Sequence, residues 1–397
     1  MRRRAFALVL LVTAVVVVAL LAVVAVVGPA VATTQADSSA IASADGDAGQ
    51  PIGVKQAETE PTEIDSCREI SEPGRYVLTR DVEDAEAAQC LRIRASDVVL
   101  DGRGHAVNGT GAFATTGVTV GAWGEGVSDV TVRNLSVADW DDGVRLTEAD
   151  GGVLENVTAT ENRIGVLLMG ASENRLSGVR AVENAVHGVS LTDDSDGNRL
   201  RSVTAAENAL FGVHLAGDAS GNEVRNATAT GNEYGVALVG ASENRVVGGE
   251  ATGNRLAGVW LSAADGNRVA DLDLSNRFYG VFLADRSANN TLRENVADGN
   301  AVGFRLRRAR GNRLVENEAS GGRDGVLLIE SDRNLVAGNR VTDNRRGVSL
   351  LASKDNRLRD NVVDGNRRNV VVARGSQNNS MPARRVDFEA SGGTTAE

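Results

Sequence analysis

Short alternating runs of apolar and polar residues dominate the chain after about residue 63. Typical runs are GVLL, GVSL and NRLSGV, and Asn or Gly interrupts them every five to eight residues. No stretch of this region keeps a 3.6-residue apolar period over three helical turns. Alternation is typical of β-strands, and the Asn and Gly residues indicate turns. The pattern predicts an all-β fold built from many short strands.

One frame returns along the chain: an Asn, a small spacer, Gly-Val-x-Leu, and then a second Asn with an aliphatic residue after it. Successive glycines of this frame are 22 to 24 residues apart. They are Gly143, Gly165, Gly188, Gly212, Gly235, Gly258, Gly280, Gly303, Gly325 and Gly347. A repeat of this length holds three short strands and three turns, and it buries its apolar face only against neighbouring repeats. We expect a parallel β-helix of about eleven coils, each of about 22–23 residues with three short strands.

The frame also assigns its residues to faces. Val and Leu of Gly-Val-x-Leu point inward, and the residue between them points outward. The outward column holds Arg145, Leu167, Ser190, His214, Ala237, Trp260, Phe282, Arg305, Leu327 and Ser349. The recurring Asn residues are expected at left-handed corners, with their amides bonded along the stack.

The two ends of the chain differ from the repeats. Three arginines precede an apolar run from Ala5 to Val27, which would span about 35 Å as a helix and cross a bilayer. Ala30-Val31-Ala32 resembles a cleavage site, so residues 1–32 are predicted to be either a signal peptide or an N-terminal membrane anchor. In both cases the remaining chain lies outside, because the positive end stays inside. We expect a flexible acidic tether (33–62), an N-terminal cap with the first coils (63–117), the β-helix repeats (118–373) and a disordered tail (374–397).

Charge and cysteine content restrict the partners and the compartment. The chain has 42 basic and 53 acidic residues, a net charge of −11, and only two lysines. Such a composition resembles that of salt-loving archaea, and it argues against a nucleic-acid partner, which requires a basic surface. Cys67 and Cys90 are expected to form a disulfide in an exported chain; the alternative is two separate buried thiols.

The beginning of the repeat region reads IDSCREISEPGRYVLTRDV, followed after a short spacer by CLRIRASDVVLDGRGHAVNG. The later repeats keep an N-x-x-G-V-x-L pattern. With these motifs, from about Ile64 to Ala373, the chain resembles the NosD-type, or carbohydrate-binding-and-sugar-hydrolase, right-handed parallel β-helix repeat proteins, including surface proteins of halophilic archaea. The resemblance implies a right-handed solenoid at the cell surface. It is specific for the fold only, because one fold supports many activities.

The resemblance implies either copper delivery or work on carbohydrates. Copper needs soft or imidazole ligands, and the chain offers three His, three Met and a cysteine pair that is expected to be oxidised. His187 and His214 fall on neighbouring coils but in different columns. Glycoside hydrolases use two carboxylates about 5–9.5 Å apart. The outward column has no carboxylate, and Asp142 and Asp324 are too many coils apart to act as a pair.

An acidic turn offers the remaining candidates for chemistry. Asp194 and Asp218, in equivalent turns of adjacent coils, are weak candidates for a catalytic pair. With Asp193 and Asp196 they are also weak candidates for a calcium site. The favoured interpretation is a solvated turn, and neither a metal nor another cofactor is expected.

Aromatic residues make up only 3% of the chain but gather on successive coils. Sugar rings stack on aromatic faces and form hydrogen bonds at their edges, so an exposed strip of this kind would suit a glycan. The predicted ligand-binding residues are Phe211, His214, Tyr234, Trp260, Tyr279, Phe282 and Arg305. The alternative is that these rings only pack along the turns. We therefore expect an exported β-solenoid that acts as a scaffold or glycan-binding module, with a polysaccharide lyase or glycoside hydrolase as the alternative.

Overall fold

The computed structural model describes residues 60–373 and 375–381, and within them every helix or strand element is a β-strand. The strands pair in parallel with strands one repeat away: Val144 pairs with Val166, which in turn pairs with Val189. The predicted parallel β-helix is therefore confirmed. The predicted signal peptide or anchor and nearly all of the tether lie outside the described residues.

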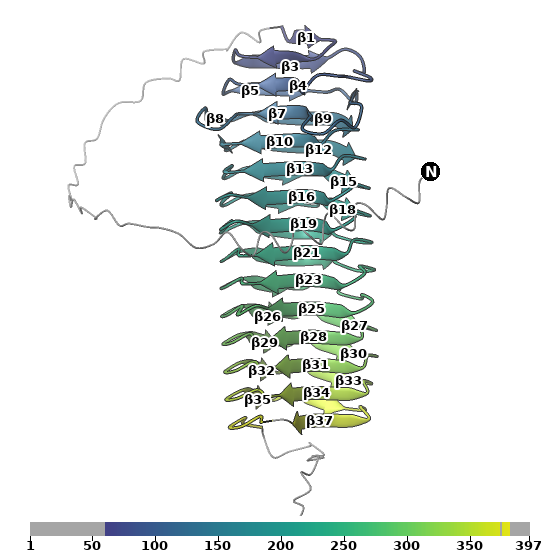
Figure 1. Cartoon of the computed structure of the whole chain (residues 1–397), viewed down its shortest axis with the longest axis vertical. Helices are drawn as coiled ribbons and strands as arrows, with labels where there is room; N and C mark the ends of the chain where they lie inside the picture. The colour runs from purple at the N-terminus through teal and green to yellow at the C-terminus, as the bar shows by residue number, and fades with distance from the viewer. Residues whose placement is uncertain (1–59, 374, 382–397) are drawn as a thin grey trace, which may run out of the picture. The chain divides into compact units, whose positions relative to one another are not determined.

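One sheet contributes one strand to every coil, and Figure 1 shows these strands stacked along the solenoid. Its 14 strands are β2 (Arg68–Ile70), β4 (Gln89–Ile93), β7 (Thr116–Val120), β10 (Asp142–Thr147), β13 (Ile164–Met169), β16 (His187–Thr192), β19 (Phe211–Ala216), β21 (Tyr234–Val239), β23 (Ala257–Ser262), β25 (Tyr279–Ala284), β28 (Val302–Arg307), β31 (Asp324–Ile329), β34 (Arg346–Leu351) and β37 (Arg368–Ala373).

The other faces of the coils are formed by shorter strands. A 17-stranded sheet contains β1 (Thr62–Ile64), β3 (Gly74–Leu78), β5 (Val98–Asp101), β6 (Ala106–Asn108), β9 (Thr131–Ala138), β12 (Val153–Thr160), β14 (Arg175–Ser177), β15 (Arg180–Val182), β17 (Arg199–Arg201), β18 (Thr204–Ala206), β20 (Glu223–Thr228), β22 (Arg245–Glu250), β24 (Arg268–Ala270), β26 (Thr291–Arg293), β29 (Arg313–Val315), β32 (Leu335–Ala337) and β35 (Arg357–Arg359). The two small sheets are β27 (Val296–Asp298), β30 (Glu318–Ser320), β33 (Arg340–Thr342) and β36 (Val362–Asp364), and β8 (Val127–Ser128) with β11 (Ala149–Asp150).

The prediction of about eleven coils was too low, since the first sheet has 14 strands, one in each coil. Ten of the 14 strands, from β10 to β34, carry the Gly-Val-x-Leu frame and are predicted from it. The end coils depart from the frame: Cys90 in β4 and Asn369 in β37 replace the glycine, and Val120 in β7 replaces the Leu. The outermost coils have fewer neighbours to match, so their sequences depart most from the repeat.

The inward columns form the core, as the frame predicts. Val166, Leu168 and Leu191 have no exposed surface, and Phe304 takes the Val position in β28 with 1% exposed. Burial of each such side chain stabilises the fold by about 1.5–3 kcal/mol. Because each strand pairs with its equivalent one coil away, the register fixes these columns and with them the outward column.

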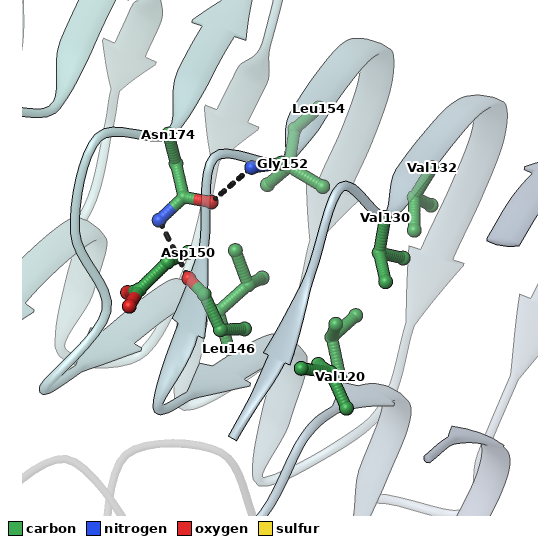
Figure 2. A pocket seen from close by; sticks show the side chains of 10 residues that line it. Val120, Val130, Val132, Leu146, Asp150, Gly152, Leu154 and Asn174 are labelled. Carbon is green, nitrogen blue, oxygen red and sulfur yellow. Dashed lines mark hydrogen bonds between the residues drawn. The ribbon is translucent and has the colours of Figure 1, made fainter. Parts of the chain in front are cut away.

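Asparagine ladders run along the corners of the stack. The amide nitrogen of Asn174 donates to Oδ1 of Asn198 at 3.1 Å and to the Ala149 carbonyl at 2.8 Å. Its Oδ1 accepts the Gly152 N–H, as Figure 2 shows. The predicted bonding along the column is confirmed. The predicted left-handed conformation is wrong for these residues: the residue just before the ladder takes it, for example Glu173 with φ 58°.

The disulfide between Cys67 and Cys90 is present, as predicted. It joins the segment before β2 to β4, so it connects two successive coils at the N-terminal end of the described stack. The side chain of Cys90 points into the core, where it is 1% exposed. The alternative of two separate thiols is therefore wrong.

Candidate functional site

The outer face of the 14-stranded sheet carries aromatic and cationic side chains from β16 to β28. We call this set the aromatic strip, and its members are His187, Phe211, His214, Tyr234, Trp260, Phe278, Tyr279, Phe282 and Arg305. Strand pairing aligns them on successive coils, because Trp260 pairs with Phe282 and Phe282 pairs with Arg305. All the ligand-binding residues predicted from the sequence therefore lie on one surface.

Trp260 is packed rather than free. Its ring stacks on Tyr234 with 4.8 Å between centroids and lies 6.1 Å from the ring of Phe211. Ala237, which precedes Trp260 in the outward column, has no exposed surface, so the larger side chains around it cover it. The sequence analysis expects exposed rings here. Trp260 and Tyr234 are instead half-buried, and Phe211 is buried with 8% of its surface exposed. The small Ala237 beside Trp260 leaves room for the large ring to lie along the sheet.

Two histidines join this first group of rings. His187 stacks on Phe211 at 4.9 Å with 5° between the ring planes, and its centroid lies 4.9 Å from that of His214. The sequence places the two histidines in different columns of neighbouring coils, and that offset is what brings their rings together. Ser190 Oγ lies 3.1 Å from His214 Nδ1, within hydrogen-bonding distance.

Burial makes both imidazoles poor bases. It lowers the pKa of His214 from 6.5 to about 4. Burial also holds the pKa of His187 well below its usual value, and the nearby His214 and Arg163 act in the same direction. Removing an imidazolium from water disfavours the charged form, so both rings are neutral at pH 7. The first group of the strip is thus an uncharged surface at neutral pH.

Arg305 organises the second group of rings. Its guanidinium lies 5.0 Å from the ring centroid of Tyr279 and 5.0 Å from that of Phe282. It also donates a hydrogen bond to the Tyr279 hydroxyl. Attraction between a cation and two ring faces contributes about 0.5–2 kcal/mol per ring and holds the guanidinium in place. The strip therefore passes from neutral rings at β16 to a fixed cation at β28.

Three buried polar atoms of the strip have no hydrogen-bond partner within the described part of the chain. They are Nδ1 of His187, Nε1 of Trp260 and Nε of Arg305. A buried donor without a partner costs about 1–3 kcal/mol. If these side chains served packing alone, apolar residues could fill the same positions without this cost. A ligand or water that reaches them through small side-chain movements would recover that free energy.

Buried ion pairs lie beyond both ends of the strip, and the sequence analysis did not find them. Asp142 in β10 is fully buried and bonds Arg145 and Arg163. Asp324 in β31 is also fully buried and bonds Arg323 and Arg346. Burial raises the pKa of the Asp142 carboxyl despite these two arginines. The sequence feature that could have indicated these ion pairs is an Arg close to each Asp in the repeat. Only the structure shows which Arg and Asp side chains form an ion pair.

The acidic residues of the turn at Asp193–Asp196 and of its neighbour at Asp218 have structural roles in the backbone turns. Asp193, Asp194 and Asp218 have φ of 54°, 58° and 65°, so they form left-handed corners. The Asp196 carboxylate accepts the backbone N–H and the hydroxyl of Ser220 on the next coil. Between residues 60 and 381, with residue 374 left out, no three His, Cys, Asp or Glu side chains are grouped to hold a metal ion. Use of this turn for calcium or catalysis stays a prediction.

A small pocket opens among the N-terminal coils, away from the strip. Figure 2 shows its lining of Val120, Val130, Val132, Leu146 and Leu154, with Asp150 and Asn174 at one side. Asn174 is engaged in its ladder bonds to Gly152 and Ala149. The pocket is a packing gap between apolar columns, and the Asp150 carboxylate at its side accepts a hydrogen bond from the Ser172 N–H.

Comparisons with known proteins agree with this geometry. Residues 105–251 match the family model described as "right handed beta helix region", and residues 241–382 match "periplasmic copper-binding protein (NosD)". The chain is a right-handed parallel β-helix protein, and its C-terminal repeats resemble the NosD family. No curated protein sequence matches it.

Solved structures show what this β-helix is similar to. One variant of the periplasmic alginate epimerase AlgG matches with a TM-score of 0.53 and 15% identity, over 74% of this chain and 76% of that chain. A second AlgG variant matches with a TM-score of 0.50 and 15% identity, over 79% and 76%. The Azotobacter vinelandii mannuronan C-5 epimerase AlgE4 A-module matches with a TM-score of 0.47 and 16% identity, over 82% and 91%. At these identities the likeness concerns the fold alone.

The residues of this β-helix do not fit a copper site. The segment that matches the copper-binding family contains neither His nor Cys, and Met381 is its one thioether. His105 lies at the turn before β6, where its Nδ1 is 2.9 Å from an Asp81 carboxylate oxygen. His187 and His214 make a pair without a third soft ligand among the described residues. Copper requires such ligands, so no step is assigned to it.

The disulfide and the match of residues 241–382 to a periplasmic family both indicate that the protein is exported. Within residues 60–373 and 375–381, no helical segment has the length and hydropathy that membrane crossing requires. The apolar run Ala5 to Val27 lies outside these residues, so a cleaved signal and a retained anchor both stay open.

Proposed function

We propose that the protein is an exported surface β-helix that binds a glycan on the aromatic strip. The observation that carries the proposal is the combination of stacked rings with the unpartnered nitrogens of His187, Trp260 and Arg305. Sugars present apolar ring faces for stacking and hydroxyl edges for hydrogen bonds, so they match such a surface. Attachment to the membrane through residues 1–32 and a halophilic source remain part of this proposal.

A hydrolase is the weaker alternative. Hydrolysis needs two carboxylates about 5–9.5 Å apart, whereas the strip presents rings, imidazoles and a guanidinium. Asp142 and Asp324 lie beyond opposite ends of the strip and are both engaged by arginines. A lyase fits the residues better, since a neutral His214 is in the protonation state that a general base needs. Its low pKa makes it a weak base, so binding without catalysis is the favoured function.

The test is retention of the full chain in gels that contain polysaccharides, compared with a double variant, Trp260→Ser with Phe282→Ser. The expected result is loss of retention, because stacked rings dominate such interfaces. Phe113→Ser with Trp123→Ser is the matched control: it removes one Phe and one Trp that are 85% and 57% exposed, in loops outside the strip. The control is expected to bind like the wild type.

Folding must be measured on both double variants. Because the strip rings are half-buried, we expect their removal to destabilise the fold by about 1–3 kcal/mol, which is more than an exposed position costs. Trp260→Leu separates the two effects, since Leu keeps apolar cover over Ala237 but lacks the ring and the N–H. A folded Trp260→Leu variant that binds as well as the wild type contradicts the proposal. Release of reducing sugars or unsaturated products identifies the enzymatic alternative.

A further inference from the structure

Three strands of the same sheet carry an Arg at the same outward position: Arg92 in β4, Arg145 in β10 and Arg305 in β28. Arg92 and Arg145 are each ion-paired with a carboxylate, whereas Arg305 is not. In β10 the segment reads DGVRL, and Arg145 is ion-paired with Asp142, three residues earlier. In β28 it reads VGFRL, and the position of Asp142 is taken by Val302. β10 and β28 share one register through the stack, so the difference lies in the side chains. Arg305 is the equivalent of Arg145 with its carboxylate missing.

Carboxylates near Arg305 are engaged elsewhere. Asp324, on the next coil, pairs with Arg323 and Arg346. Among the described residues Arg305 has no carboxylate partner: its contacts are two rings and the Tyr279 hydroxyl, and its Nε is buried without an acceptor. A half-buried guanidinium without a counter-ion within the protein is unfavourable, and an anion from outside the chain would supply the missing partner.

Other cations add to this end of the strip. Arg277 lies 5.4 Å from the Phe278 ring centroid, and Arg307 follows Arg305 at the end of β28. Neither lies within ion-pair distance of a carboxylate in the described part of the chain, although the charge of Arg307 helps Arg308 to lower the pKa of Glu330. The whole protein has a net charge of −11, so this local excess of unpaired positive charge is the opposite of the general trend.

We infer that the β25–β28 end of the aromatic strip binds an anionic group of an acidic polysaccharide, a carboxylate or a sulfate ester, through Arg305. The inference rests on the proposed glycan binding and names the class of glycan. A guanidinium presents a planar fork of N–H donors that matches the oxygens of either group, and the rings of Tyr279 and Phe282 already fix its orientation. The sugar rings would then extend along the strip toward Trp260.

The probes for the test are polygalacturonate, its fully methyl-esterified form, dextran sulfate and dextran, each in gel electrophoresis of the full chain. Methyl esterification keeps the sugar ring and removes the charge, so the first two polymers differ only in the feature that Arg305 is inferred to read. We expect retention by polygalacturonate or dextran sulfate, whichever carries the right anion, at least roughly 10-fold stronger than by the two uncharged polymers.

Three variants examine the residue itself. Arg305→Gln is expected to lose the preference for the anionic polymer, and Arg305→Lys to keep only part of it, because Lys lacks the fork. Val302→Asp recreates the Asp-Gly-x-Arg sequence of β10. The new carboxylate should form an ion pair with Arg305 and so weaken the binding of an external anion, although the guanidinium is still present. Arg313→Gln is the matched control, since it removes an exposed Arg from β29 of the same coil, on another sheet.

The outcomes separate the two proposals. Equal retention by the charged and esterified polymers, or unchanged preference in a folded Arg305→Gln variant, overturns the role of Arg305 and leaves glycan binding intact. Absence of binding to all four polymers overturns both. Circular dichroism and melting of each variant show that a loss of binding is not a loss of fold.

Discussion

Acidification should destabilise the coils that carry His187 and His214. Below about pH 6.5 the histidines of the unfolded chain take up protons, whereas the folded chain resists, because burial lowers the pKa of His214 to about 4. The unfolded state therefore binds more protons between these two values. By linkage, the free energy of unfolding must fall as the pH drops through this window.

The size of the effect follows from the shift. A fall in pKa from 6.5 to about 4 corresponds to about 3 kcal/mol at roughly 1.4 kcal/mol per pKa unit. This is an upper bound, because solvent reaches part of the His214 ring and screens its charge. His187 acts in the same direction, since its pKa is also depressed by burial, by His214 and by Arg163.

The assay is urea unfolding of the full chain followed by circular dichroism at several pH values between about 7 and 4.5. His214→Asn is expected to be less sensitive to pH than the wild type over this range. His105→Asn is the control, because it removes the histidine of the β5–β6 turn, which lies outside the strip. If the wild type and His214→Asn lose stability in parallel on acidification, the burial argument is refuted.

Three further predictions concern the frame, and unfolding by denaturant checks each of them. Reduction of the Cys67–Cys90 disulfide, which spans 23 residues, should cost about 2–4 kcal/mol; an unchanged midpoint would show that the first coils do not need it. Asn244→Leu should cost about 3 kcal/mol or more, because Asn222 and the Ala219 carbonyl of the preceding coil lose their partners; a loss below about 1 kcal/mol contradicts the ladder's role. Leu238→Asp should destabilise more than Ala237→Asp, although Ala237 is also fully buried; equal losses contradict the inward and outward assignment.

The sequence predicts everything that repetition fixes. The spacing of Gly143, Gly165 and Gly188 determines the coil length, and the alternation around them determines which side chains are inside. Parallel pairing then follows, because equivalent residues of successive coils must lie side by side. The same logic predicts that Trp260, Phe282 and Arg305 lie on one surface.

Repetition does not determine the rotamer of an outward side chain, and therefore does not determine how much of its neighbours it covers. The frame places Ala237 in the outward column and so predicts a residue that is open to solvent. That expectation is wrong, because the larger side chains around Ala237 close over it and leave no exposed surface. Contact between His187 and His214 was missed for the same reason: it depends on rotamers across two columns, and the frame carries no information about rotamers.

The strongest functional evidence comes from positions where the repeat is broken. Identical frames fold identically, so a residue that departs from the frame without serving the stack calls for another explanation. Val302 shows this most clearly: an Asp at the equivalent position of β10 neutralises Arg145, and a buried Val in β28 leaves Arg305 without a counter-ion. Stability alone would favour the ion pair, or an uncharged residue in place of Arg305. A cation held between two rings and left unpaired is what a site for an external anion requires, and the other coils provide the comparison that makes the difference visible.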